Sequence, residues 1–419
     1  MTPVLAEAGK STKNVAAVSR TPFQIPGFSV AAVESGSRYQ GRLDLALIAA
    51  DSPEGCTASG VFTRNAFCAA PVEICRERLK NRKAKAVLVN AGIANACTGE
   101  PGKQRASEMT AAAAEALGCA ANLVLPASTG VIGMELPLGP AVRVMPELVG
   151  ALRADGWEDA AKAIMTTDTV PKMASAQVVL GGKTVTIGGI AKGSGMIAPD
   201  MATLLAFVCT DASVGPDVLD HWTKAATDKS FNCITVDGDT STNDSLIVLA
   251  SGAAGNPVLN GIESADSRAF GEALGAVLED LAVQLVTDGE GATKLIEIGV
   301  VGAADIAAAR TVALTVANSP LVKTAFFGED ANWGRIVAAA GRAGVKVIPE
   351  KVTLFFEDLC VFKGGTPVLG KEIEEKATRV FKQKEIRVRL DLGMGNAEFT
   401  AYTCDFSFDY VKINASYRS

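Results

Sequence analysis

Histidine is almost absent from this chain of 419 residues, which contains only His221. A serine or cysteine nucleophile usually needs an imidazole base, and no carboxylate pattern around His221 indicates a catalytic triad. Aromatic residues make up only 5% of the chain, so platforms that stack nucleic-acid bases are not expected. The formal net charge is −6 and no Lys/Arg cluster is present, which argues against a phosphate-backbone partner. The composition therefore predicts no nucleic-acid partner.

Cysteine is present nine times, but no two cysteines form a Cys-x-x-Cys pair. The odd number and the lack of a signal peptide in the first 14 residues predict reduced cysteines in a cytoplasmic protein. Cys97 and Cys233 could each be proposed as a nucleophile, but without a histidine partner both are better interpreted as buried small hydrophobic residues. No apolar run is long enough to cross a bilayer, so no membrane partner is expected.

Strands and helices are predicted to be mixed along the whole chain. Gly181-Gly182 separates two apolar runs, a pattern typical of a β-hairpin. Apolar residues keep helical spacing over residues 268–286. Residues 346–356 and 385–392 are predicted as strands of a smaller C-terminal α/β segment. The pattern predicts an α/β or α+β layered sandwich.

The most informative stretch is Lys192-Gly-Ser-Gly-Met-Ile-Ala-Pro-Asp-Met-Ala-Thr203, followed by an apolar run at residues 204–209. Gly193 and Gly195 allow positive φ and close approach of the backbone to another group. The apolar run has the length of a fully buried strand. A hydroxyl group at the start of such a strand, behind a tight loop, is held rigidly, which is favourable for a nucleophile.

Thr203 can work without histidine if the peptide bond between Ala202 and Thr203 is cut. The freed α-amine then acts as the base for the hydroxyl group of the same residue. An α-amine titrates near ~8, so a useful fraction is unprotonated at neutral pH. The pattern alone still favours a simpler interpretation, in which Thr203 is a β-branched residue that opens a strand.

Further motifs give this stretch a more specific meaning. In chain order they are Val89-Asn-Ala-Gly-Ile-Ala-Asn-Ala-Cys-Thr-Gly99, Ser128-Thr-Gly-Val-Ile-Gly133, Ala163-Ile-Met-Thr-Thr-Asp-Thr169, Ser230-Phe-Asn-Cys-Ile-Thr-Val-Asp-Gly-Asp-Thr-Ser-Thr-Asn-Asp244, Asp288-Gly-Glu-Gly-Ala-Thr-Lys294 and Tyr410-Val-Lys-Ile-Asn-Ala-Ser-Tyr-Arg-Ser419. Together with the stretch that ends at Thr203, they resemble the ornithine acetyltransferase (glutamate N-acetyltransferase) family of arginine biosynthesis over nearly the whole chain.

The resemblance implies an N-terminal-nucleophile-like autoprocessing acyltransferase fold. Self-cleavage between Ala202 and Thr203 would give an alpha chain of residues 1–202 and a beta chain of residues 203–419. Two alpha and two beta chains are expected to form a heterotetramer. Two departures from the family pattern are Asp200, where asparagine is usual, and Ser419, where threonine is usual.

The resemblance also assigns roles to individual residues. Thr129 and Gly130 are implied as the oxyanion hole, in a Ser-Thr-Gly sequence that is expected to form a tight turn after a strand. The implied substrate contacts are Thr166, Lys192, Thr203, Glu290, Asn414 and Ser419, with Thr167 as an alternative to Thr166. From the residues alone, Lys192 could pair with a carboxylate of the protein or of a substrate, and Glu290 could be solvated or could face the ammonium group of ornithine.

The implied reaction is a ping-pong transfer of acetyl from N2-acetylornithine to glutamate through an acetyl-Thr203 enzyme. One amide is exchanged for another, so no cofactor is expected, and acetyl-CoA as a second donor is left open. Asp237-Gly-Asp-Thr-Ser-Thr-Asn243 lacks the glycine and the glutamate of a calcium loop, so no metal is predicted. The alternatives are an N-terminal-nucleophile aminopeptidase or amidase, with water as the acceptor, and a non-catalytic binding protein.

Overall fold

The apolar run after Thr203 forms β9, a central strand in which every side chain is buried. The computed structural model describes residues 17–198 and 204–416. In it, β9 is flanked by β8 and β11 within a six-stranded sheet, called here the central sheet, of order β4-β3-β11-β9-β8-β7. Its strands are β3 (Cys56–Phe62), β4 (Lys83–Ala84), β7 (Lys172–Leu180), β8 (Lys183–Lys192), β9 (Leu205–Thr210) and β11 (Ser245–Ala250).

The predicted hairpin at Gly181-Gly182 is confirmed by the antiparallel pairing of β7 and β8. Both glycines have positive φ, at 55° and 78°, as a two-residue hairpin turn requires. The end of β8 pairs with the start of β9, with Lys192 opposite Leu205. The residues on either side of the glycine-rich loop are therefore neighbours in one sheet.

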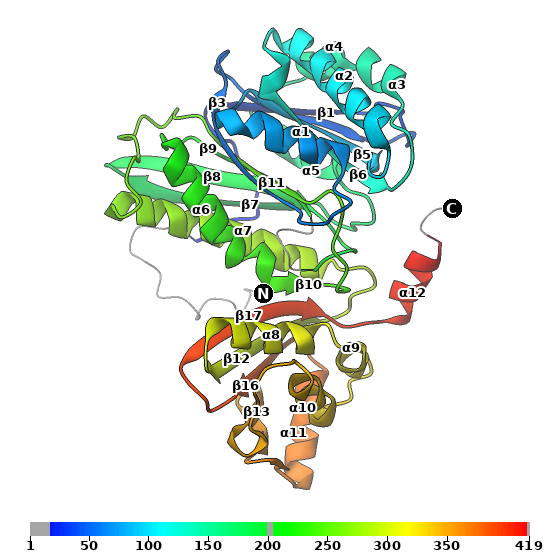
Figure 1. Cartoon of the computed structure of the whole chain (residues 1–419), viewed down its shortest axis with the longest axis vertical. Coiled ribbons are helices and arrows are strands. Elements are labelled where there is room, and N and C mark those ends of the chain that lie inside the picture. The colour runs from blue at the N-terminus through cyan, green and yellow to red at the C-terminus, as the bar shows by residue number, and fades with distance from the viewer. Residues whose placement is uncertain (1–16, 199–203, 417–419) are drawn as a thin grey trace.

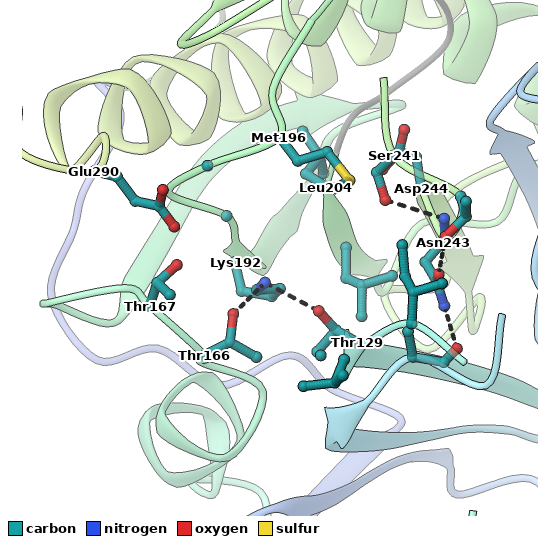
Figure 2. A pocket seen from close by; sticks show the side chains of 18 of the residues that line it. Thr129, Thr166, Thr167, Lys192, Met196, Leu204, Ser241, Asn243, Asp244 and Glu290 are labelled. Carbon is teal, nitrogen blue, oxygen red and sulfur yellow. Dashed lines mark hydrogen bonds between the residues drawn. The ribbon is translucent and has the colours of Figure 1, made fainter. Parts of the chain in front are cut away.

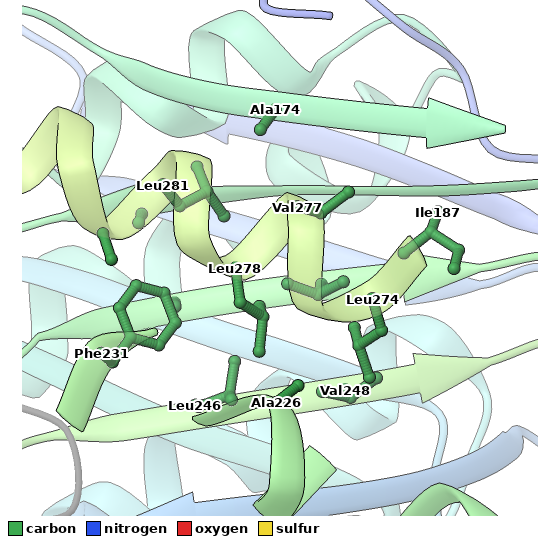
Figure 3. Close-up of a cluster of buried hydrophobic side chains, with 14 of the residues drawn as sticks. Ala174, Ile187, Ala226, Phe231, Leu246, Val248, Leu274, Val277, Leu278 and Leu281 are labelled. Atoms are coloured by element: carbon green, nitrogen blue, oxygen red, sulfur yellow. The ribbon is translucent and has the colours of Figure 1, made fainter. Parts of the chain in front are cut away.

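Two helices, α6 (Pro216–Asp228) and α7 (Ala265–Thr287), cover one face of the central sheet. The predicted helix at residues 268–286 is confirmed, and it begins at Ala265 because the Ser264 side chain accepts a hydrogen bond from Ser267 N. Its buried face includes Leu274, Leu278 and Leu281, which pack against the strands (Figure 3). The helical spacing seen in the sequence thus places this helix on the sheet.

The other face of the central sheet packs on a four-stranded sheet, called here the N-terminal sheet. It consists of β1 (Phe28–Val33), β2 (Leu45–Ala50), β5 (Ala86–Ile93) and β6 (Val124–Val131). Its outer face is covered by α2 (Gly99–Leu117), α3 (Leu138–Arg143) and α4 (Met145–Gly150). Helices α1 (Ala70–Arg78) and α5 (Trp157–Ala163) contribute to the core between the sheets. The predicted layered sandwich therefore has the order helix, sheet, sheet, helix (Figure 1).

The expectation of a tight turn at Ser128-Thr129-Gly130 is wrong. Strand β6 continues to Val131, and Thr129 and Gly130 lie opposite Ala91 and Gly92 of the parallel strand β5. A side chain at Gly130, whose φ is 130°, would bring Cβ to 2.1 Å from the carbonyl carbon of Gly92. Glycine at position 130 thus lets the two strands remain paired to this point, and the turn follows at residues 132–133.

The lower part of the molecule in Figure 1 is built on a seven-stranded sheet, called here the C-terminal sheet, of order β10-β17-β12-β16-β13-β14-β15. Its strands are β10 (Ile234–Thr235), β12 (Leu295–Ala303), β13 (Thr353–Phe356), β14 (Leu359–Lys363), β15 (Thr366–Pro367), β16 (Glu385–Asp391) and β17 (Ala397–Cys404). The helices of this part are α8 (Ile306–Ala317), α9 (Pro320–Phe327), α10 (Trp333–Gly341), α11 (Lys371–Phe381) and α12 (Phe408–Ala415).

Of the two strands that the sequence predicts for this part, one agrees with the structure and the other is too long. The strand predicted at residues 385–392 corresponds to β16, whose buried Ile386, Val388 and Leu390 alternate with charged residues. The strand predicted at residues 346–356 is too long, because a proline, which lacks a backbone N–H, opens the 3₁₀ turn Pro349–Lys351 before β13. Other 3₁₀ turns are Leu79–Asn81, Ala121–Leu123 and Phe231–Cys233. Within the described ranges, no helix has the length and apolar character of a membrane span.

Candidate active site

The start of β9 lies at the wall of a cavity of about 380 Å³ (Figure 2). Its walls come from β6, the segment after α5, the loop after β8, the loop before β11, the segment after α7, and α12. The residues expected from the sequence that it brings together are Thr129, Gly130, Thr166, Lys192, Glu290 and Asn414, with Thr167 beside Thr166. Leu204 also lines the cavity. Ala202, Thr203 and Ser419 lie outside the described residues.

Lys192 lies at the end of β8 with its ammonium group inside this cavity. Its Nζ donates hydrogen bonds to Thr129 Oγ1 at 3.0 Å and to Thr166 Oγ1 at 2.8 Å (Figure 2). Burial lowers the pKa of Lys192, and the nearby carboxylate of Asp168 opposes that shift. Both readings of Lys192 from the sequence are compatible with this geometry, because its Nζ is 3.9 Å from Asp168 Oδ2 and also lines the cavity.

The hydroxyl groups of Thr129 and Thr166 accept hydrogen bonds from a group that can only donate. An ammonium ion has no acceptor, so each hydroxyl keeps its own hydrogen for another partner. Thr129 and Thr166 both line the cavity, so that hydrogen can be donated to a bound molecule. The arrangement supplies hydroxyl donors next to a fixed positive charge, which suits an oxygen that becomes negative during a reaction.

Asp168 lies beneath Lys192 and organises the surrounding backbone. Its Oδ1 accepts hydrogen bonds from Lys172 Nζ at 2.6 Å and from Gly193 N at 2.7 Å, and its Oδ2 accepts one from Thr166 N at 3.0 Å. Burial alone would raise the pKa of Asp168, but the two lysines outweigh it and lower the pKa to about 2. Asp168 is therefore ionised, and it compensates the buried charge of Lys192.

Glu290 follows α7 and faces the cavity across the glycine-rich loop. Its side chain accepts a hydrogen bond from Asn414 Nδ2 at 2.7 Å, so the C-terminal helix α12 is docked on the site. A Cβ added at Gly195 would lie 2.5 Å from the Glu290 carboxylate carbon. Only glycine at this position lets the loop pass so close to the carboxylate. Glu290 is buried rather than solvated, which favours the reading in which it faces a cation.

The polar loop before β11 holds the glycine-rich loop in place. Asp237 accepts hydrogen bonds from Met196 N at 2.6 Å and Ile197 N at 2.9 Å, in addition to one from Asp239 N within its own loop. Asn243 Nδ2 donates to Ala94 O at 2.6 Å and to Ser128 O at 2.8 Å. These bonds join the loop to the strand end that carries Thr129, so the loop positions two walls of the cavity.

Asp244 is a buried carboxyl group on the cavity wall. One of its oxygens, Oδ2, is buried without a hydrogen-bond partner among the described residues. Burial raises the pKa of Asp244 well above its ordinary value. Ser245 pairs with Leu205 in the parallel strands β11 and β9, so Asp244 lies beside Leu204, the residue before β9. The cavity thus contains a carboxyl group that burial makes harder to ionise than an exposed aspartate, next to the residue that follows Thr203.

Comparisons with known proteins identify the family. Residues 29–419 match the model described as the ArgJ family. The chain belongs to the ArgJ family. The arginine biosynthesis bifunctional protein ArgJ of Geobacter sulfurreducens is 50% identical over 398 residues, which cover 95% of this chain and 100% of that protein. The protein of the same name from Symbiobacterium thermophilum is 52% identical over 380 residues, which cover 90% and 93% of the two chains. The family resemblance inferred from the motifs is confirmed, and with it the assignment to an acetyltransferase family of arginine biosynthesis.

Two solved structures are similar to parts of this ArgJ-family chain. The arginine biosynthesis bifunctional protein ArgJ from Bacillus halodurans gives a TM-score of 0.47 at 43% identity, and the match covers 49% of this chain and 96% of that chain. The ornithine acetyltransferase from Mycobacterium tuberculosis, solved in complex with ornithine, gives a TM-score of 0.41 at 35% identity. That match covers 45% of this chain and 100% of the other.

Sequence reasoning missed the acidic and basic groups behind the cavity wall. Asp168 and Asp288 stand in motifs that carry the family resemblance, and that is the signal that could have singled them out. Lys172 gave no signal, because lysine is usually exposed and here its side chain is fully buried.

Of the two cysteines considered as nucleophiles, Cys233 is buried as expected. The expectation is wrong for Cys97, which is exposed in the segment just before α2, outside the packed elements.

Proposed function

We propose that this ArgJ-family chain transfers acetyl from N2-acetylornithine to glutamate through an acetyl-Thr203 intermediate, and so releases ornithine and forms N-acetylglutamate. The observation that carries the proposal is the convergence on one cavity of Thr129, Gly130, Thr166, Lys192, Glu290 and Asn414. They come from five separate segments, and their cavity includes Leu204, the residue bonded to Thr203. Nothing but the tertiary fold brings these segments together.

Maturation by self-cleavage is the first step of the proposal. The Thr203 hydroxyl oxygen attacks the carbonyl carbon of Ala202, the C–N bond breaks, and an ester forms while the α-amine of Thr203 is released. Water then hydrolyses the ester, which leaves a carboxylate on Ala202 and a free Thr203 hydroxyl. Strands β8 and β9 lie on opposite sides of the cut and pair over the whole of β9, which supports two chains that stay associated after cleavage.

In turnover, the α-amine of Thr203 accepts the hydroxyl proton as the oxygen attacks the acetyl carbonyl carbon. The carbonyl oxygen becomes negative and receives hydrogen bonds from Thr129 Oγ1–H and Gly130 N–H. The intermediate collapses when the N2 atom of ornithine leaves with the proton held by the α-ammonium. Glutamate then enters, its N2 atom attacks the acetyl-Thr203 ester, and the hydroxyl group is restored.

The charges of the cavity match the two amino acids that share it. Lys192 is a fixed cation that suits a substrate carboxylate, and its threonine partners are oriented by the same ammonium group. Glu290, held by Asn414, suits the side-chain ammonium of ornithine. Because both substrates carry an α-amine and an α-carboxylate, one site can hold them in turn. This sharing supports a ping-pong order rather than a ternary complex.

The proposed chains are residues 1–202 and 203–419, and the proposed assembly contains two of each. The central sheet would include strands from both chains, since β3, β7 and β8 precede the cut and β9 and β11 follow it. The helix–sheet–sheet–helix order supports an N-terminal-nucleophile-like fold with the nucleophile at a central strand. Acetyl-CoA is proposed as a second acetyl donor, in keeping with the relatives' description as bifunctional.

Intact mass spectrometry followed by a product assay tests the proposal. Two masses that correspond to residues 1–202 and 203–419 are expected from the wild type, and a single mass from Thr203→Ala. Supplied with N2-acetylornithine and glutamate, the wild type should accumulate N-acetylglutamate. Acetate and ornithine as the only products would favour an amidase, and one continuous active chain would refute the nucleophile. Labelled acetyl-CoA with glutamate tests the second donor in the same assay.

A further inference from the structure

Lys172, at the start of β7, is a buried lysine that does not itself line the cavity. Its side chain is fully buried, and its Nζ contacts Asp168 Oδ1 at 2.6 Å and Asp288 Oδ2 at 2.5 Å. A buried ammonium ion is costly unless opposite charges and hydrogen bonds compensate it. Two carboxylates supply that compensation here. The position of Lys172 therefore depends on Asp168 and Asp288, and the positions of these carboxylates depend on Lys172.

Each of these carboxylates is fixed to a segment that carries a residue of the cavity wall. Asp168 accepts hydrogen bonds from Thr166 N and Gly193 N, so it contacts both the segment with Thr166 and the residue after Lys192. Asp288 lies two residues before Glu290 and accepts a hydrogen bond from Thr169 N at 2.9 Å.

Ser194, two residues after Lys192, connects the glycine-rich loop to the segment that carries Glu290. Its hydroxyl group donates to Asp288 O at 2.8 Å, and its carbonyl oxygen accepts from Glu290 N at 2.8 Å. The segments that carry Thr166, Lys192 and Glu290 thus meet behind the cavity. Lys172 lies at their junction.

We propose that Lys172, held between Asp168 and Asp288, is a positioning residue that joins the three segments carrying Thr166, Lys192 and Glu290 and balances the charge of Lys192. The junction consists of alternating charges, in the order Lys192, Asp168, Lys172 and Asp288. Asp168 favours the protonated form of Lys192 from 3.9 Å, whereas the like charge of Lys172 disfavours it. Glu290 and Asp244 on the cavity wall also favour the protonated form. The inference rests on the proposed role of Lys192 as a substrate contact.

Two substitutions shift the charge of this junction in opposite directions. Asp168→Asn removes the carboxylate nearest Lys192, so the alkaline limb of the pH profile for glutamate kcat/KM should move to lower pH by about one unit. Lys172→Met removes the like charge, so the same limb should move to higher pH, while kcat/KM at neutral pH falls roughly ten-fold because the segments lose their junction. A purely structural role would not shift the limb in opposite directions.

Asp405→Asn is the matched control. Asp405 is also buried and accepts hydrogen bonds from Thr293 N at 2.8 Å and Lys294 N at 2.9 Å, but it does not line the cavity. This variant should lower Tm without moving the alkaline limb. If Lys172→Met does not fold, Lys172→Met/Asp288→Asn removes one charge of each sign and takes its place.

Lys192→Met separates failure of this inference from failure of the proposed function. Full activity of Lys192→Met would remove the proposed substrate contact itself. If Lys192→Met is inactive while the alkaline limbs of wild type, Asp168→Asn and the Lys172 variant coincide, the substrate contact stands and the positioning role of Lys172 is overturned. Limbs that move in the same direction would overturn it as well.

Discussion

Replacement of Thr129 by valine tests the proposed oxyanion hole, because valine keeps the shape of threonine and removes only the hydroxyl group. Thr129 is 8% exposed, and its Oγ1 accepts a hydrogen bond from Lys192 Nζ at 3.0 Å. Since the ammonium group can only donate, the Thr129 hydrogen is available for the carbonyl oxygen of the substrate. Valine removes that donor and one of the two threonine acceptors of Lys192.

The size of the effect follows from when the hydrogen bond forms. A donor that binds the oxyanion only in the transition state raises kcat by a factor of about 10²–10³. The valine variant should lose this factor in kcat, and its KM should change little. Loss of the acceptor for Lys192 should also lower the free energy of unfolding by about 1–3 kcal/mol. Thr166 still accepts a hydrogen bond from Lys192 at 2.8 Å, so the ammonium group keeps a partner and the variant is expected to fold.

The assay is the initial rate of N-acetylglutamate formation from N2-acetylornithine and glutamate, normalised to folded protein. Thr129→Ser is the control, because it restores the hydroxyl group and should recover most of kcat. A kcat for Thr129→Val within about three-fold of wild type would show that no donor at this position stabilises the transition state. A serine variant as slow as the valine variant would assign the loss to packing instead.

Three further predictions address the substrate charge, the core and the acid limit of stability. Glu290→Gln keeps an oxygen for Asn414 but removes the negative charge. In steady-state kinetics, KM for N2-acetylornithine should therefore rise roughly ten-fold, and KM for glutamate should change less. Equal increases in the two KM values would contradict a contact with the ornithine ammonium. Leu281→Ala leaves a void between α7 and the central sheet and should lower the free energy of unfolding in urea by roughly 2–5 kcal/mol, whereas exposed Leu369→Ala should have little effect. Asp168 has a folded-state pKa of about 2, below its unfolded value, so it stabilises the fold above pH ~4 by about 2 kcal/mol, and this contribution is lost as the pH falls toward 2. Unfolding measured against pH should lose this acid-dependent step in Asp168→Asn, and an unchanged step would contradict the assignment.

Local patterns in the sequence determined several elements and the family. The continuous apolar run at residues 204–209 predicted buried β9, and Gly181-Gly182 predicted the hairpin, because burial and turn geometry both act over a few residues. The motifs carried the family resemblance, since each of them is contiguous. Through that resemblance they also indicated residues such as Lys192 and Glu290, which the structure places in one cavity.

Only the tertiary structure decided how these pieces meet. The Ser-Thr-Gly sequence reads as a turn, but residue 130 lies in β6, where the backbone of the neighbouring strand at Gly92 leaves no room for a Cβ and so requires glycine. Lys172 reads as a surface residue, and it becomes a buried junction only because Asp288, which is distant in the chain, approaches the local pair of Lys172 and Asp168. Charge pairing and strand contact of this kind depend on long-range neighbours, which a local pattern does not contain.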